Sequence, residues 1–139
     1  MDVKRLLMTA KINNKMEREL LEDVFVTALE GASNYWYVIS SEAKAKIRSA
    51  VPRSVDPCLS TAILTAILDH GVSVEINDLD NPDEVLGVLN YENIKERLHL
   101  LDMSLDYKWA LEAHEEEVGD GESADVVFQF LVMGDVWFS

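Results

Sequence analysis

Apolar residues recur at helical spacing in four stretches of the chain, residues 15–30, 57–69, 91–116 and 123–133. Gly31 and Gly71 follow the first two stretches, at the place where glycine most often ends a helix. Asn90 stands just before the third stretch and is a good N-cap residue. The pattern therefore predicts four helices, together with a shorter basic helix at 40–50.

Two further stretches show the alternation of apolar and polar residues that is typical of strands. Residues 72–77 form one such run, and after an acidic turn residues 85–89 are expected to return as a second strand, which predicts a β-hairpin over 72–89; residues 6–12 predict an edge strand. A chain of 139 residues is long enough to bury one core. We therefore expect an α+β fold, a helix-rich single compact domain over residues 1–139. In it, the four helices pack on a small antiparallel sheet made of the N-terminal strand and the hairpin.

The second and fourth helices carry specific expectations about burial. Asp56, followed by a proline, suits the N-cap of the second helix, and Cys58 in the first turn is expected to be a small buried thiol. The fourth helix, capped by Ser123, is apolar on every side, which predicts burial in this core or against a second copy of the chain. Trp137 and Phe138 are expected to dock rather than fray. A homodimer formed through these apolar surfaces is therefore one of the expectations.

Charge is distributed unevenly along the chain. The net charge is −14, and residues 1–70 hold nine basic and nine acidic side chains, whereas residues 71–139 hold three basic and seventeen acidic ones. Such a surface repels nucleic-acid phosphates, so no direct nucleic-acid binding is expected. It attracts a basic protein surface, although solubility alone also explains it. With one cysteine, no signal-peptide pattern and no apolar run near the ~20 residues of a membrane span, we expect a cytoplasmic protein without membrane contact.

Three consecutive aromatic residues, Tyr35, Trp36 and Tyr37, interrupt the helical pattern. They suit either a stacking platform for a flat ligand such as a nucleotide base, or core packing with their polar atoms paired at its rim. Core packing is favoured because no basic residues flank the aromatic run. The cations that a nucleotide phosphate needs lie farther along the chain, at Lys44, Lys46, Arg48 and Arg53.

The acidic turn of the expected hairpin contributes the remaining candidate binding residues, Asp78, Asp80, Asp83 and Glu84. Its Asp-x-Asp start is that of a calcium loop, which needs glycine at its sixth position and glutamate at its twelfth. Asp83 and Leu89 stand at those positions, so no metal site is expected. The chain has no glycine-rich phosphate loop, nucleophile elbow or HExxH motif, so neither a cofactor nor a catalytic residue is assigned.

Two stretches are similar to a known family, TALEGASNYWY at 27–37 and ADVVFQFLVMGDVWF at 124–138. With a hairpin and a long helix between them, they resemble a family of small bacteriophage and prophage proteins of uncharacterised function. This chain departs from the family pattern at Ala32 and Met133, where a glycine and a phenylalanine are usual, and residues 40–70 have no counterpart. The resemblance covers about two-thirds of the chain and implies a phage-encoded cytoplasmic accessory protein. It carries over no catalytic residue.

These observations favour a function without enzymatic activity. The first hypothesis is a phage-encoded accessory protein that binds a host protein with a basic surface through the acidic half of the chain, with counter-defence as one role. The alternative is a protein that binds or sequesters a small molecule such as a nucleotide signal. That ligand would stack on the aromatic run and place its phosphate against the cations.

Overall fold

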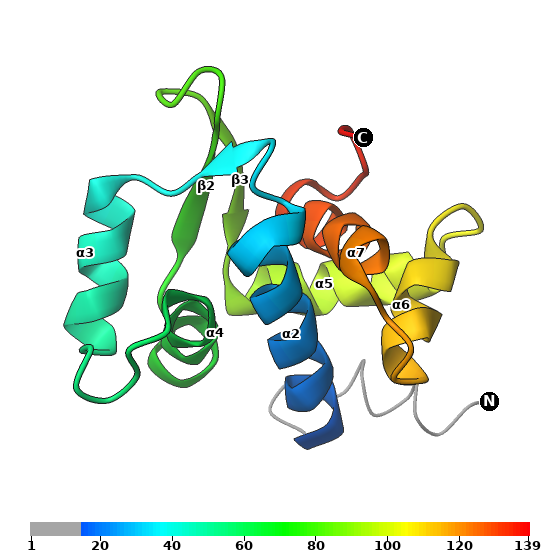
Figure 1. Ribbon diagram of the computed structural model, residues 1–139, viewed down its shortest axis with the longest axis horizontal. Coiled ribbons are helices and arrows are strands. Elements are labelled where there is room, and N and C mark those ends of the chain that lie inside the picture. Colours follow the sequence, from blue (N-terminus) through cyan, green and yellow to red (C-terminus); the bar gives the residue numbers. More distant parts are fainter. Residues whose placement is uncertain (1–14) are drawn as a thin grey trace.

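The computed structural model describes residues 15–139, so the strand expected at 6–12 lies outside the described residues. The chain forms, in order, α2 (Lys15–Thr27), the π-type turn η1 (Ala28–Ala32), β1 (Tyr37–Val38), α3 (Ser41–Ala50), α4 (Leu59–His70), β2 (Val74–Asp78), β3 (Val85–Leu89), α5 (Tyr91–Asp102), α6 (Lys108–Glu115) and α7 (Gly121–Met133). The predicted α+β class is confirmed, because helices dominate and the strands form a small antiparallel sheet (Figure 1).

The sheet has the order β1-β2-β3, and both neighbouring pairs are antiparallel. The predicted hairpin is confirmed as β2 and β3. Within the described residues the third strand is β1, which comes from the aromatic run and pairs Tyr37 with Asp78 and Val38 with Asn77. In Figure 1 the sheet stands between α3 on one side and α2, α5 and α7 on the other, and the β2–β3 loop projects beyond the helices.

Helix α7 lies at the centre of the apolar core. It packs against α2, η1, β3, α5 and α6, and all its residues from Ser123 to Val132 except Val126 are buried. The prediction of a buried closing helix is confirmed, and this chain's own core provides the burial. The cap differs from the expectation: Asp120 is the N-cap and accepts from the backbone N–H of Ser123 at 2.9 Å. The hydroxyl of Ser123 accepts from the backbone N–H of Asp120 at 2.8 Å.

The prediction of one continuous helix over 91–116 is wrong, because the structure has two helices, α5 and α6, separated by a turn. In this turn the hydroxyl of Ser104 accepts a hydrogen bond from the backbone N–H of Tyr107 at 3.2 Å. A serine side chain thus takes the place of a helical carbonyl as backbone partner. The break allows α5 and α6 each to pack against α7. Leu105, which the sequence places on the apolar stripe, lies in the turn and is 99% exposed.

The helix expected to open at Pro57 begins at Leu59 instead, with Cys58 at the N-cap position. Asp56 still stabilises this end, because its carboxylate accepts from the backbone N–H of Cys58 at 3.0 Å and from the hydroxyl of Thr61 at 2.6 Å. The prediction of a buried thiol is wrong, since Cys58 is exposed. The later start places Cys58 ahead of the first turn, outside the apolar face that α4 buries.

Candidate functional site

The β2–β3 loop brings the four acidic candidates together at one end of the sheet (Figure 1). We call Asp78, Asp80, Asp83 and Glu84 the acidic tip. Asp80, Asp83 and Glu84 are exposed, and Asp78 is half-buried at the end of β2. The sequence prediction that these side chains lie in one turn is confirmed by the loop between the two strands.

Hydrogen bonds hold the acidic tip in a defined conformation. The backbone N–H of Asp78 donates to the carbonyl of Glu84 at 3.0 Å, and the N–H of Asp80 donates to the carboxylate of Asp78 at 3.0 Å. The side-chain amide of Asn77 donates to the carbonyl of Pro82 at 2.6 Å. A loop that is ordered before binding loses less conformational entropy when a partner binds.

Apolar side chains accompany the charges of the acidic tip. Leu79 is 42% exposed and Val85 is 43% exposed, one on each side of the turn. The segment from residue 71 to residue 94 contains no lysine or arginine that would neutralise the carboxylates. Exposed aliphatic surface next to carboxylates that no lysine or arginine of residues 71–94 offsets suits a protein partner whose surface is basic at its rim.

The aromatic run contributes to the core rather than to an open platform. Trp36 is 2% exposed, its indole N–H donates to a carboxylate oxygen of Asp125 at 2.8 Å, and its ring stacks on Phe138 with the centroids 5.4 Å apart. Tyr37 is half-buried and donates to the carbonyl of Leu29 at 3.0 Å. Tyr35 remains 46% exposed, with its hydroxyl donating to Asp125 at 2.5 Å. Of the two interpretations of this run, core packing with paired polar atoms describes the geometry.

Two buried polar residues of α7 organise this region and were missed in the sequence. Asp125 also accepts from the hydroxyl of Ser33 at 2.7 Å, and it accepts from the side-chain amide of Gln129 at 3.2 Å. Burial and the hydrogen bond to this carboxylate raise the pKa of Tyr35 above its ordinary range. The signal available in the sequence was a polar pair one turn apart, Asp125 and Gln129, within a helix that is otherwise apolar on every side.

The stability of this region should fall at alkaline pH. Burial raises the pKa of Tyr37 from its ordinary value of 10.0 to about 12. The unfolded chain therefore loses this proton first, and the stability that the neutral phenol contributes is present below pH 10.0 and is lost as the pH approaches about 12. Urea unfolding across this interval should give a falling free energy of unfolding. The Tyr37→Phe variant should start about 1 kcal/mol less stable for want of a hydrogen bond, yet fall less steeply. Equal slopes in both proteins would contradict the assignment.

The cationic candidates lie apart from the aromatic run. Lys44, Lys46 and Arg48 belong to α3, on the opposite side of the sheet from α7, and Arg53 is exposed in the segment after α3 (Figure 1). Two of the four have structural contacts. The ammonium of Lys46 donates to the carbonyl of Ser73 at 3.0 Å, and the guanidinium of Arg48 donates to the carbonyl of Pro57 at 3.1 Å. The geometry therefore gives the nucleotide hypothesis no site in which rings and cations meet.

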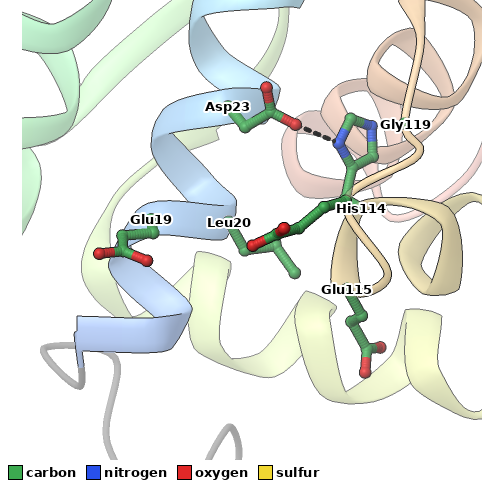
Figure 2. A pocket seen from close by; sticks show the side chains of 7 residues that line it. Glu19, Leu20, Asp23, His114, Glu115 and Gly119 are labelled. Atoms are coloured by element: carbon green, nitrogen blue, oxygen red, sulfur yellow. Dashed lines mark hydrogen bonds and ion pairs between the residues drawn. The ribbon is translucent and has the colours of Figure 1, made fainter.

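A hollow of about 300 Å³ lies between α2 and the connection from α6 to α7. Its lining residues are Glu19, Leu20, Asp23, His114, Glu115, Glu117 and Gly119. Figure 2 shows Asp23 and His114 pointing toward each other from α2 and α6, with Nδ1 of His114 2.7 Å from the carboxylate of Asp23. The other ring nitrogen, Nε2, lies 3.0 Å from the hydroxyl of Ser123 at the start of α7.

This serine–histidine–aspartate connection has the order of a hydrolase triad but the opposite exposure. Ser123 is 1% exposed, and its hydroxyl is already engaged in the capping box of α7. The side chain of Asp23, in contrast, is 55% exposed. A nucleophile must reach the substrate, so a buried serine hydroxyl does not support acyl transfer. The arrangement instead joins α2, α6 and α7 through one buried imidazole.

The turn after α6 folds closely over this imidazole. Glu117 has a φ of 60°, the backbone N–H of Val118 donates to the carbonyl of Ala113, and the N–H of Glu117 donates to the carbonyl of His114. This is a Schellman ending in which glutamate occupies the left-handed position that glycine usually takes. A side-chain carbon at Gly119 would lie 2.3 Å from the ring of His114, so only glycine fits there.

Between residues 15 and 139, no three His, Cys, Asp or Glu side chains are grouped so that they would hold a metal ion. In the same stretch, each helix is too short or too polar to cross a membrane.

No known protein family, curated protein or solved structure matches this chain. The resemblance to phage proteins therefore stays a prediction, and the candidate sites are assessed on their own geometry. Of the residues singled out in the sequence, the structure brings together the acidic tip and the aromatic run, which lie on neighbouring strands. A backbone hydrogen bond of 3.0 Å from the N–H of Leu79 to the carbonyl of Trp36 links the two.

Proposed function

We propose that this chain is a non-enzymatic accessory protein that binds a host protein with a basic surface through the acidic tip. The observation that carries the proposal is the combination found in the β2–β3 loop. Its carboxylates are exposed on an ordered, projecting turn, and residues 71–94 contain no basic side chain that would neutralise them.

The chemistry of the tip suits protein recognition in two ways. The carboxylates supply long-range attraction, which accelerates the encounter with a basic surface and weakens as salt screens it. Leu79 and Val85, each exposed over about two-fifths of its surface, supply the apolar contact that gives an interface its affinity. Asp78 orders the turn, and Asp80, Asp83 and Glu84 are the side chains that meet the partner in this proposal.

The biological setting is part of the same proposal. The likeness of residues 27–37 and 124–138 to phage and prophage proteins supports a phage-encoded protein that works in the host cytoplasm. A host protein with a basic surface is then the partner, and blunting a host defence is the role that such binding would serve.

A charge-neutral tip tests the proposal. The triple variant Asp80→Asn, Asp83→Asn, Glu84→Gln removes three charges and leaves Asp78 to order the turn. We expect the natural chain to retain a basic host protein from bacterial lysate at low salt, and the tip variant to retain at least ~10-fold less. The affinity of the purified pair should fall as the salt concentration rises.

The matched control removes three charges elsewhere, with Glu96→Gln, Asp106→Asn and Glu116→Gln, all at exposed positions on or beside α5 and α6. It has the same net charge as the tip variant, so it should retain the partner like the natural chain. An equal loss of partner binding in both variants would show that binding depends on net charge and not on the acidic tip. If the tip variant still retained the partner, the acidic tip would not be part of the binding interface.

A further inference from the structure

The segment after α7 is held against the molecule in an unusual way. Gly134 ends α7 with a φ of 75°, and residues 135–139, which we call the closing segment, follow it and bring the ring of Phe138 onto Trp36. Val136 and Phe138 are half-buried and pack against the core, and they alternate with the exposed Asp135 and Trp137, so one side of the segment lies on the molecule. Trp137 is 59% exposed.

One buried side chain recognises the backbone of the closing segment. The side-chain oxygen of Gln129 accepts from the N–H groups of Trp137 and Phe138, both at 2.9 Å, and its amide nitrogen donates to the carbonyl of Phe138 at 3.0 Å. Gln129 itself is 0% exposed. These three bonds involve only main-chain atoms of the segment, so they do not depend on which side chains the segment carries.

The ring of Phe138 supplies the selective contact. It lies almost parallel to the indole of Trp36, with an angle of 9° between the planes and the centroids 5.4 Å apart. The indole N–H also donates to the carboxylate of Asp125 at 2.8 Å, so the orientation of this ring does not depend on the closing segment alone. A flat apolar side chain is therefore the one that fits between Gln129 and Trp36.

We propose that Trp36 and Gln129 form a peptide-binding slot, and that a partner protein uses it by replacing the closing segment with a segment of its own that carries a phenylalanine and adopts the same backbone conformation. The closing segment already shows the chemistry of the ligand, namely two successive N–H groups, one carbonyl and one phenyl ring. Within residues 15–139, no backbone–backbone hydrogen bond joins 135–139 to the rest of the fold, so side chains hold the segment: Gln129 by its hydrogen bonds, Trp36 by the ring stack, and the core by its contact with Val136. This inference is independent of the acidic tip.

Release of the closing segment competes with binding of the partner. A segment tethered beside its own site has an effective concentration in the millimolar range, which weakens the apparent affinity of a competitor. Removing the Phe138 ring while keeping the chain at full length should therefore open the slot. The probe is a capped peptide with the sequence of residues 135–139, Asp-Val-Trp-Phe-Ser, and its matched control has alanine in place of phenylalanine.

Binding is followed through the nuclear magnetic resonance signal of the Trp36 indole N–H. The phenylalanine peptide should shift this signal in the full-length Phe138→Ala variant with an apparent affinity at least ~10-fold higher than in the natural chain. The alanine peptide should leave the signal unchanged. Equal responses to both peptides, or none to either, would overturn the proposal. A shift that depends on protein concentration without peptide would also overturn it, because a second copy would then be the occupant.

A second measurement uses the natural chain and does not depend on the folding of the variant. An excess of the phenylalanine peptide should accelerate hydrogen exchange at the amides of Trp137 and Phe138, because their acceptor on Gln129 becomes occupied by the peptide. Exchange that the peptide leaves unchanged would show that the closing segment is not displaceable.

Discussion

Replacing Asp125 with alanine should lower the free energy of unfolding by about 3–5 kcal/mol. The carboxylate accepts hydrogen bonds from the hydroxyl of Ser33 and the indole N–H of Trp36, which are both buried, and from the hydroxyl of Tyr35. Alanine leaves the two buried donors without an acceptor, and each orphaned donor costs about 1–3 kcal/mol. Urea unfolding measures the loss, and the near-ultraviolet circular dichroism of Trp36 reports whether its surroundings change.

Two further variants separate the network from the helix that bears it. Asp125→Asn keeps one acceptor oxygen for Ser33 and Trp36 but turns an amide toward Gln129, which is itself a donor there, so the loss should be intermediate. Glu122→Ala removes an exposed carboxylate from the first turn of the same helix and should change stability by less than about 1 kcal/mol. An Asp125→Ala variant as stable as Glu122→Ala would show that the network contributes nothing.

Replacing Gly87 with alanine should destabilise the protein by about 3 kcal/mol, at the upper end of overpacking costs. Gly87 lies in β3, where the strand passes the end of α7, and a Cβ atom there would lie 2.0 Å from the carbonyl oxygen of Val132. The obstacle is backbone, so a rotamer change cannot relieve it. Val132 is also held by the guanidinium of Arg97, which donates to its carbonyl at 2.5 Å. Either the hairpin or the end of α7 must move, and the melting temperature measures the result.

The matched control is Gly121→Ala at the first residue of α7. Its new Cβ would meet only the side chain of Ala32, at an ordinary contact distance of 3.5 Å. Alanine is also a better helix former than glycine, so this variant should be neutral or slightly more stable. If Gly87→Ala behaved like Gly121→Ala, the close approach between β3 and α7 would be refuted.

The sequence predicted well those helix ends that a capping residue beside them determines. Asn90 caps α5 by accepting from the backbone N–H of Asn93 at 2.8 Å, and Gly71 ends α4 with a φ of 65°. The break between α5 and α6 was missed because the apolar spacing continues through it to Leu105. The turn at the break has a local hydrogen bond to the Ser104 hydroxyl, and α5 and α6 each pack against α7; apolar periodicity contains neither feature. The pairing of β1 with β2 was also not predictable from local pattern, because it joins residues far apart in the sequence, such as Tyr37 and Asp78.

The candidate sites were predictable to different degrees for the same reason. The acidic tip consists of neighbours in sequence, so their common location follows from one turn. Tyr35 and Trp36 find their acceptor, Asp125, about ninety residues away, and no spacing rule connects them. His114 likewise finds its carboxylate on α2, at Asp23, rather than on its own helix.

The arrangement of the sheet bears on how the molecule behaves when it is crowded. An exposed outer strand is a template onto which other chains can add and grow into fibres. Among the described residues, one edge strand of the sheet, β1, is only two residues long, and the other, β3, is packed against α7. With a net charge of −14 on every copy, neighbours also repel one another. Concentrated solutions should therefore stay clear of amyloid-type aggregates for as long as α7 remains in place.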